Sequence, residues 1–249
     1  MLSDGQKRPF LMPFGIALEG QRFGSVVDKF SESYTFERVE GVPFNYGCRV
    51  FASRERIFPL FTALCALITK PCTVLLADYT VPTGESFQSD VTPKEVIFDA
   101  FSRRSFQIAN DGAMQLFVES EGFEVEIGKH KELQILAVSL TQVLEVLKDY
   151  GIPKEPKRTL FEDAPHDHVP ISKLFEDRET RKNCEPLPRE EVEKYEADPK
   201  AYKNFKQELV RELRMKVYDE TGGGAEDPRP ESLMPPTAFQ YRLPWTKLT

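Results

Sequence analysis

Cysteine, histidine and tryptophan are scarce in this sequence of 249 residues, which has four Cys, three His and one Trp. No two cysteines have the C-x-x-C spacing that is typical of zinc ribbons and redox motifs. A chain of this length buries a core without disulfides, so we expect reduced thiols and a cytoplasmic protein. The four cysteines are Cys48, Cys65, Cys72 and Cys184.

Long hydrophobic runs are also missing. The longest apolar segment, residues 57–69, ends before Lys70-Pro71 and is shorter than the roughly 20 residues that cross a bilayer. Near the N-terminus an apolar stretch follows Lys7-Arg8, but prolines and a glycine interrupt it, and Asp4 lies where an export signal would be positive. We therefore expect a soluble protein with no membrane span and no export signal.

Glycine-rich phosphate motifs and the G-x-S-x-G elbow of many hydrolases are absent. Acidic residues exceed basic ones by 40 to 33, which gives a net charge of −7. Because binding to a phosphate backbone needs a surplus of Lys and Arg, nucleic acid is not expected as the main partner. Carboxylate pairs such as Glu124 and Glu126 alternate with apolar residues, which indicates the wet face of a strand rather than acid–base catalysis.

Composition changes along the chain near residue 152. Most of the 19 phenylalanines precede this point, whereas most of the 19 prolines follow it. A segment that is rich in charge and poor in apolar residues cannot bury enough surface to fold alone. We therefore divide the chain into an α+β core domain with an extended N-terminal arm (1–152), a charged, proline-rich connector (153–198), an amphipathic helix (199–221) and an extended, proline-rich aromatic tail (222–249).

The first part opens with a β-α-β pattern. Residues 44–51 alternate apolar and polar side chains as a strand does, and a helix is predicted over 53–69. The apolar run 72–77 predicts a strand that is buried on both faces. In Thr92-Pro93-Lys94-Glu95, Thr occupies the N-cap, Pro the first helical position and Glu the third, which predicts a helix over 93–103.

A meander of strands is expected next. Asn110-Asp111-Gly112 has the Asp-Gly pair of a tight turn, so we interpret the flanking residues 105–109 and 113–119 as a hairpin. Alternation over 123–127 predicts a further strand with one apolar face, and 133–138 supplies the next.

The first part closes with a helix. A capping box begins at Ser139, and apolar residues at helical spacing follow until Gly151 and Pro153 stop the helix. The predicted order is β-α-β-α-β-β-β-β-α. This order favours an α+β fold, in which helices pack on one face of a mixed or antiparallel sheet, with a charged helical and extended C-terminal part.

The second part contains one long predicted helix. It begins at Asp198-Pro199, runs to about Tyr218 and ends before three glycines. Its narrow apolar face is typical of a helix that lies on the core domain of its own chain or pairs with a helix of a partner. The residues of this face are Tyr202, Phe205, Leu209, Leu213 and Val217.

Ligand-type side chains gather in Asp163-Ala164-Pro165-His166-Asp167-His168. On an extended segment, two imidazoles two residues apart point the same way and can fill two coordination positions of zinc or another divalent metal, with Asp163 or Asp167 adding a carboxylate. The alternative is a solvated surface loop. His130 is interpreted as a turn residue, and Cys184 is the one thiol that we consider as a partner for His166 or His168.

Two functions follow from these features. The tail carries Phe239, Tyr241 and Trp245 on a segment that is too short for a core of its own. This indicates a non-enzymatic binding or assembly subunit that engages protein partners through its terminal arms and long helix. No cofactor is expected for such a subunit. The surface that receives the tail is either a partner or the chain's own first domain. The alternative function is a metal-dependent hydrolase with His166 and His168 as ligands. A small-molecule pocket between sheet and helices is a third hypothesis, to which the sequence assigns no residues.

Overall fold

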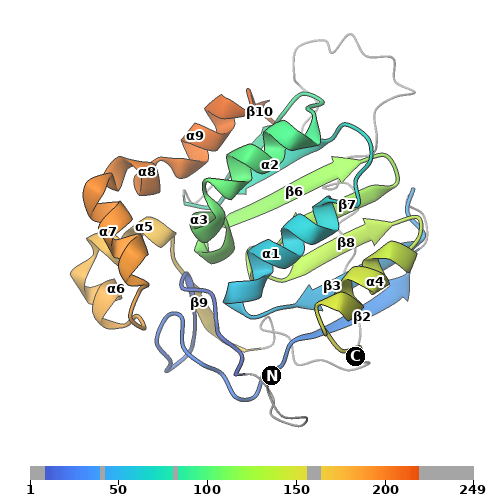
Figure 1. Ribbon diagram of the computed structural model, residues 1–249. Coiled ribbons are helices and arrows are strands. Elements are labelled where there is room, and N and C mark those ends of the chain that lie inside the picture. The colour runs from blue at the N-terminus through green and yellow to red at the C-terminus, as the bar shows by residue number, and fades with distance from the viewer. Residues whose placement is uncertain (1–8, 40–42, 81–83, 156–163, 219–249) are drawn as a thin grey trace.

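The structure is a computed structural model, and it describes residues 9–39, 43–80, 84–155 and 164–218 (Figure 1). Its largest element in these ranges is an antiparallel sheet of eight strands in the order β10-β5-β4-β6-β7-β8-β3-β2. The predicted α+β class is confirmed. No helix in the described part of the chain combines the length and the apolar character that crossing a membrane requires. The strands are β2 (Ser33–Arg38), β3 (Tyr46–Phe51), β4 (Thr73–Asp78), β5 (Glu85–Gln88), β6 (Met114–Ser120), β7 (Phe123–Ile127), β8 (Leu133–Ala137) and β10 (Lys216–Val217).

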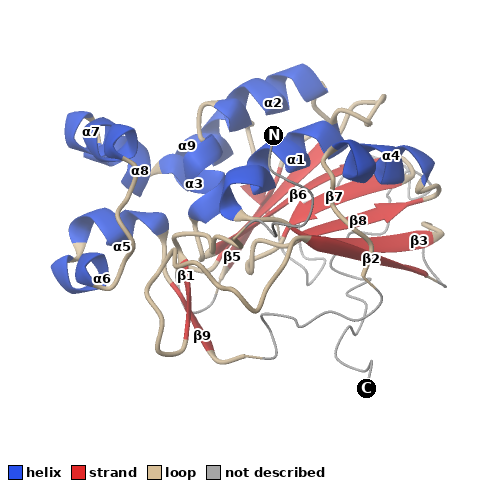
Figure 2. Ribbon diagram, turned by 60° about the horizontal axis from the view of Figure 1, so that its bottom comes forward, coloured by secondary structure: helices blue, strands red, loops and turns tan. Residues whose placement is uncertain are grey.

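Helices cover one face of this sheet, as Figure 2 shows. The strands alternate, so that Val74, Val118 and Val125 form one row of paired residues whose side chains are fully buried beneath the helices. This row and the apolar stripes of the helices make the main core, which is the principal source of stability because burying each such side chain contributes roughly 1.5–3 kcal/mol. The helices on this face are α1 (Arg54–Cys65), α2 (Lys94–Ser102), α3 (Ser105–Asn110) and α4 (Thr141–Asp149).

The predicted hairpin around Asp111-Gly112 is wrong in its first half. Residues Ser105–Asn110 form the helix α3, while β6 follows the turn as expected. Ile108 and Ala109 are buried, and the Asn110 side chain holds the helix end by donating to the Phe106 carbonyl at 2.9 Å. Asp111 accepts from the Ala113 amide at 2.9 Å, so Asp-Gly does form a turn, but the turn joins a helix to a strand.

A smaller unit lies beside the sheet and is built from the two ends of the described chain. Its two strands pair antiparallel, and short helices follow the second strand (Figure 1). Phe10, Met12 and Ile16 of the N-terminal arm form a second core with Phe51, the last residue of β3. The elements are β1 (Ile16–Leu18), β9 (His166–His168), α5 (Ile171–Glu176), α6 (Arg178–Lys182), α7 (Arg189–Ala197), α8 (Pro199–Lys203) and α9 (Phe205–Glu212).

The long helix predicted after Asp198-Pro199 is two helices and a strand. Asp198 caps α8 by accepting from the Lys200 and Ala201 amides, Asn204 separates α8 from α9, and Arg214, at φ 53°, ends α9. The chain then turns so that β10 pairs with β5, and Val217 is 77% exposed instead of continuing the apolar face. The other four members of the predicted face are buried, which shows that this segment docks on its own chain.

Several elements were not predicted from the sequence. Strands β1, β2, β5 and β9 and helices α5 to α7 are short and carry no clear period, and the last four of these lie in what was interpreted as a connector. Asp163, Phe239, Tyr241 and Trp245 are outside the described residues.

Candidate metal centre

All three histidines of the chain meet at one place. His166 and His168 lie on β9, and His130 lies in the turn between β7 and β8. The ring centroid of His130 is 4.8 Å from that of His166 and 5.0 Å from that of His168, and the last two are 4.8 Å apart. Each ring offers a nitrogen, and these nitrogens lie within 4.8 Å of one another.

Strand pairing brings two of these rings to the same side. His168 stands opposite Ile16 and His166 opposite Leu18 in the β1–β9 register, with Asp167 between them. Successive side chains of a strand alternate, so Asp167 points away and is exposed. The sequence-based expectation that the two imidazoles share a side agrees with this geometry, although the segment is a short strand rather than a loop.

Two glycines set the position of β9. Val169 donates its amide to the Gly15 carbonyl at 2.9 Å, and its own carbonyl accepts from the Gly112 amide at 3.0 Å. A Cβ atom at Gly15 would lie 2.4 Å from the Gly112 nitrogen, and one at Gly112 would lie 2.2 Å from the Gly15 oxygen. Only glycine permits such an approach of two backbones, so this contact fixes the distance between β9 and the start of β6.

Each imidazole directs its Nδ1 atom toward an oxygen atom. His168 Nδ1 lies 2.9 Å from the Gly112 carbonyl, and His166 Nδ1 lies 2.6 Å from the Ala164 carbonyl. Because a carbonyl only accepts, both Nδ1 atoms carry the proton, and Nε2 keeps its lone pair. His130 Nδ1 faces Glu132 Oε2 at 3.9 Å. His168 Nε2 is buried and has no hydrogen-bond partner among the described residues.

The electrostatics of the site keep His168 neutral. Burial, together with the neighbouring His130 and His166 rings, lowers the pKa of His168 to about 3. A metal binds the neutral form of imidazole, so this ring is in the ligating state at neutral pH.

The turn that carries His130 is anchored by its buried neighbours. Lys131 adopts a φ of 60°, is buried, and donates from Nζ to the Met114 carbonyl at 2.9 Å. Burial lowers the pKa of Lys131 to about 8. A Cβ atom at Gly128 would lie 2.9 Å from Glu132 Oε1, so the carboxylate of Glu132 occupies space that only glycine leaves free.

A buried ion cluster contacts the chain just after β9. Lys206 of α9 is 5% exposed and donates to Asp78 at 2.7 Å, and its Nζ lies 3.3 Å from Asp111. Burial by itself would raise the pKa of Asp78, but the Lys206 ammonium lowers it overall. Asp111 also accepts from the Ile171 amide at 3.0 Å, just after β9. The cluster therefore ties α9, β4, the α3–β6 turn and the chain beyond β9 together.

The remaining residues that the sequence proposed as metal ligands do not join the three histidines. Asp167 points away from the histidines, and Asp163 is outside the described residues. Cys184 forms a parallel bridge with Phe23, and burial raises the pKa of its thiol to about 11, which leaves it protonated and a poor nucleophile. Sequence reasoning missed His130 as a candidate ligand. Its only signal was that the other two histidines of the chain lie together in one segment.

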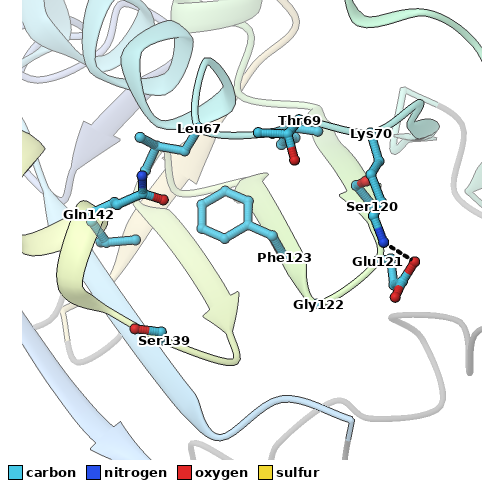
Figure 3. Close-up of a pocket in the computed structure, with 11 residues that line it drawn as sticks. Leu67, Thr69, Lys70, Ser120, Glu121, Gly122, Phe123, Ser139 and Gln142 are labelled. Atoms are coloured by element: carbon cyan, nitrogen blue, oxygen red, sulfur yellow. Dashed lines mark hydrogen bonds and ion pairs between the residues drawn. The ribbon is translucent and has the colours of Figure 1, made fainter.

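A hollow elsewhere on the protein is a weaker candidate for a functional site than the three histidines. It lies between the end of α1, the β6–β7 turn and the start of α4, with Phe123 and Gln142 on its wall (Figure 3). Its volume of about 210 Å³ is below the roughly 300 Å³ at which ligand pockets begin. Its charged groups, Lys70 and Glu121, are exposed and pair with each other.

No known protein family, curated protein or solved structure matches the chain.

Proposed function

We propose that the protein is a metal-dependent enzyme of the hydrolase type, in which His130, His166 and His168 hold a divalent ion of the zinc class. The observation that supports this most directly is the proximity of the three rings, which each offer one nitrogen within 4.8 Å of the others. The Nδ1 atoms of His166 and His168 are committed to carbonyl oxygens, so these two rings would bind an ion through Nε2.

Three imidazoles are a suitable ligand set for zinc and related metals. Tetrahedral zinc with bonds of about 2.0–2.1 Å would place its nitrogens about 3.3 Å apart, so nitrogen separations of up to 4.8 Å would have to shorten by as much as about 1.5 Å when an ion binds. Three protein ligands leave a fourth position for water, whose pKa a zinc ion lowers to about 7. His166 and His168 are partly exposed, so a route for water and substrate to that position would pass along β9.

Asp163 decides between two forms of this proposal. If its carboxylate supplied a fourth ligand, the ion would be enclosed as in a structural site, and the open position would be lost. Replacing Asp163 by Ala would then weaken metal binding, whereas a three-histidine site keeps its affinity.

The assembly hypothesis stays a prediction beside this proposal, because Phe239, Tyr241 and Trp245 are outside the described residues. A cytoplasmic location is part of the proposal. It is supported by four buried cysteines that are free thiols.

The test is metal content and metal chemistry on the full chain. Purified protein is stripped with a chelator, reloaded with Zn²⁺ or Co²⁺ and dialysed, and we expect one equivalent of metal and a tetrahedral Co²⁺ spectrum. His166→Ala, His168→Ala and His130→Ala should each lose the metal, while the matched control Asp167→Ala should retain it. Activity is then assayed on phosphoester, carboxylic ester and amide substrates. Protein that retains no metal after reloading, or ester hydrolysis that survives in the His variants, would contradict the proposal.

A further inference from the structure

The sheet face opposite the helices has a composition unlike that of a solvent-exposed surface. In the register of β4, β6, β7 and β8, Leu75 pairs with Phe117, Phe117 with Glu126 and Glu126 with Gln134. The neighbouring row pairs Glu119 with Glu124 and Glu124 with Leu136. We call the face formed by these two rows the open face.

Apolar groups of the open face are removed from solvent without joining a core. Leu75 is 6% exposed, yet it belongs to neither hydrophobic core of the described residues. Helices α1 to α4 pack on the opposite face, and α5 to α8 lie beside the sheet (Figure 2), so these helices do not account for this burial.

Carboxylates of the same face are buried too. Glu124 is 4% exposed, and its Oε2 atom has no hydrogen-bond partner among the described residues. It stands directly opposite Glu119, whose pKa burial raises to about 7. Carboxylates on directly opposite residues of paired strands repel each other, and a buried polar atom without a partner is costly, so a positively charged or donor group belongs here.

The end of the chain can reach this face. The last described strand, β10, pairs with β5 at one edge of the sheet, and the Tyr218 amide donates to the Ser86 carbonyl at 2.7 Å. Residues 219–249 continue from that edge. At about 3.3 Å per residue they span up to roughly 100 Å, whereas eight strands spaced by about 4.8 Å are less than 40 Å wide.

The chemistry of that segment complements the open face. Between residues 232 and 249, Arg242 and Lys247 occur without any acidic residue, and Phe239, Tyr241 and Trp245 supply aromatic surface. We propose that residues 232–249 dock on the open face of their own chain, with the aromatic side chains against Leu75, Phe117 and Leu136 and with a cation beside Glu124 and Glu119.

A second copy of the chain fits this face less well. A symmetric dimer through the open face would place the same patch of each protomer against the other, which brings carboxylates toward carboxylates. The C-terminal segment brings positive charge instead, and its tether gives it a high local concentration.

Trp245 is the single tryptophan of the chain, so its fluorescence reports on the segment in the intact protein. We expect blue-shifted emission and acrylamide quenching several-fold weaker than that of a synthetic peptide of residues 232–249, independent of protein concentration. Arg242→Glu should move both readings toward the peptide. Lys200→Glu, the same charge change on the exposed surface of α8, should leave them unchanged.

A photo-crosslinking residue at position 245 locates the docked segment. Intramolecular crosslinks to peptides from β4, β6, β7 or β8 support the proposal. Quenching equal to that of the peptide, crosslinks to α2 or α4, or protection that appears only as the protein dimerises would each overturn it. None of these readouts requires a metal, so the result is independent of the proposed metal centre.

Discussion

The Nδ1 atom of His168 lies 2.9 Å from the carbonyl oxygen of Gly112, the residue whose backbone also touches that of Gly15. The contact that fixes β9 against β6 is therefore the same one that orients a candidate ligand. A substitution that alters the backbone contact between Gly15 and Gly112 would therefore also move the His168 ring.

Gly112→Ala should disrupt both. The added Cβ atom would meet the Gly15 oxygen at 2.2 Å and the Val169 oxygen at 3.0 Å, and neither backbone atom can yield cheaply. We expect a loss of at least about 2 kcal/mol in the free energy of unfolding, together with weaker Zn²⁺ binding. Urea denaturation and zinc titration measure the two effects. Gly20→Ala is the control, because Gly20 has a positive φ of 75° but no atom near the position of an added Cβ. Normal zinc affinity in Gly112→Ala would refute the argument.

The pKa of His168 predicts how the metal-free protein responds to acid. Its folded pKa of about 3 lies below the unfolded value of about 6.5, so the unfolded chain binds more protons between these two values. Stability from this residue is therefore complete above pH 6.5 and falls as the pH drops toward 3, by at most about 1.4 kcal/mol per pH unit.

Urea melts of the metal-free protein from pH 4 to 7 measure this slope. The matched variant is His168→Asn, whose amide can still donate to the Gly112 carbonyl but does not titrate. We expect a shallower pH dependence in the variant, and equal slopes in the two proteins would count against a neutral, buried His168.

Sequence patterns predicted the parts of the fold that repeat locally. Alternation through Phe123, Val125 and Ile127 and the helical spacing after Ser139 correspond to β7 and α4. The Asp111-Gly112 turn was also found, but a turn signal does not specify whether a helix or a strand precedes it. The helix α3 is decided by tertiary packing of Ile108 and Ala109, which no local pattern encodes.

The candidate site divides in the same way. The period of two places His166 and His168 on one side of any extended segment, and this was predictable. His130 joins them only because β1 pairs with β9 and because Gly15 and Gly112 meet, and both contacts link residues far apart in sequence. The identity of the third ligand could not be derived from spacing.

Glu132 is expected to position His130. Its Oε1 atom accepts from Gln134 at 3.2 Å, while Oε2 faces His130 Nδ1 at 3.9 Å and has no hydrogen-bond partner among the described residues. Closure of the rings around an ion would shorten the contact to a hydrogen bond. Removing a carboxylate of this kind usually reduces metal affinity by about 10–100-fold.

Competition with a chromophoric zinc chelator tests this role. Glu132→Gln should weaken Zn²⁺ binding while keeping the fold, as circular dichroism would verify, and Glu121→Gln on the exposed β6–β7 turn should have no effect. Unchanged zinc affinity in Glu132→Gln would show that the carboxylate only packs against Gly128.

Lys206→Met should be among the most destabilising substitutions of a single charge. Lys206 contacts both Asp78 and Asp111 in a buried setting, and removing one partner of a buried ion cluster usually costs about 3–5 kcal/mol because the remaining charges stay uncompensated. The half-exposed ion pair of Lys203 with Glu176 offers a matched control, for which Lys203→Met should cost less than about 1 kcal/mol.

The pH dependence of Lys206→Met identifies the cause of its instability. Without the ammonium, the folded pKa of Asp78 rises from its lowered value, so the variant loses stability relative to the unsubstituted protein as the pH increases and Asp78 ionises. The loss should therefore be smaller at pH 4.5 than at pH 7, and the double variant Lys206→Met/Asp78→Asn should recover part of it at pH 7. Equal losses at both pH values, with no recovery in the double variant, would mean that Lys206 stabilises α9 by packing and not by charge.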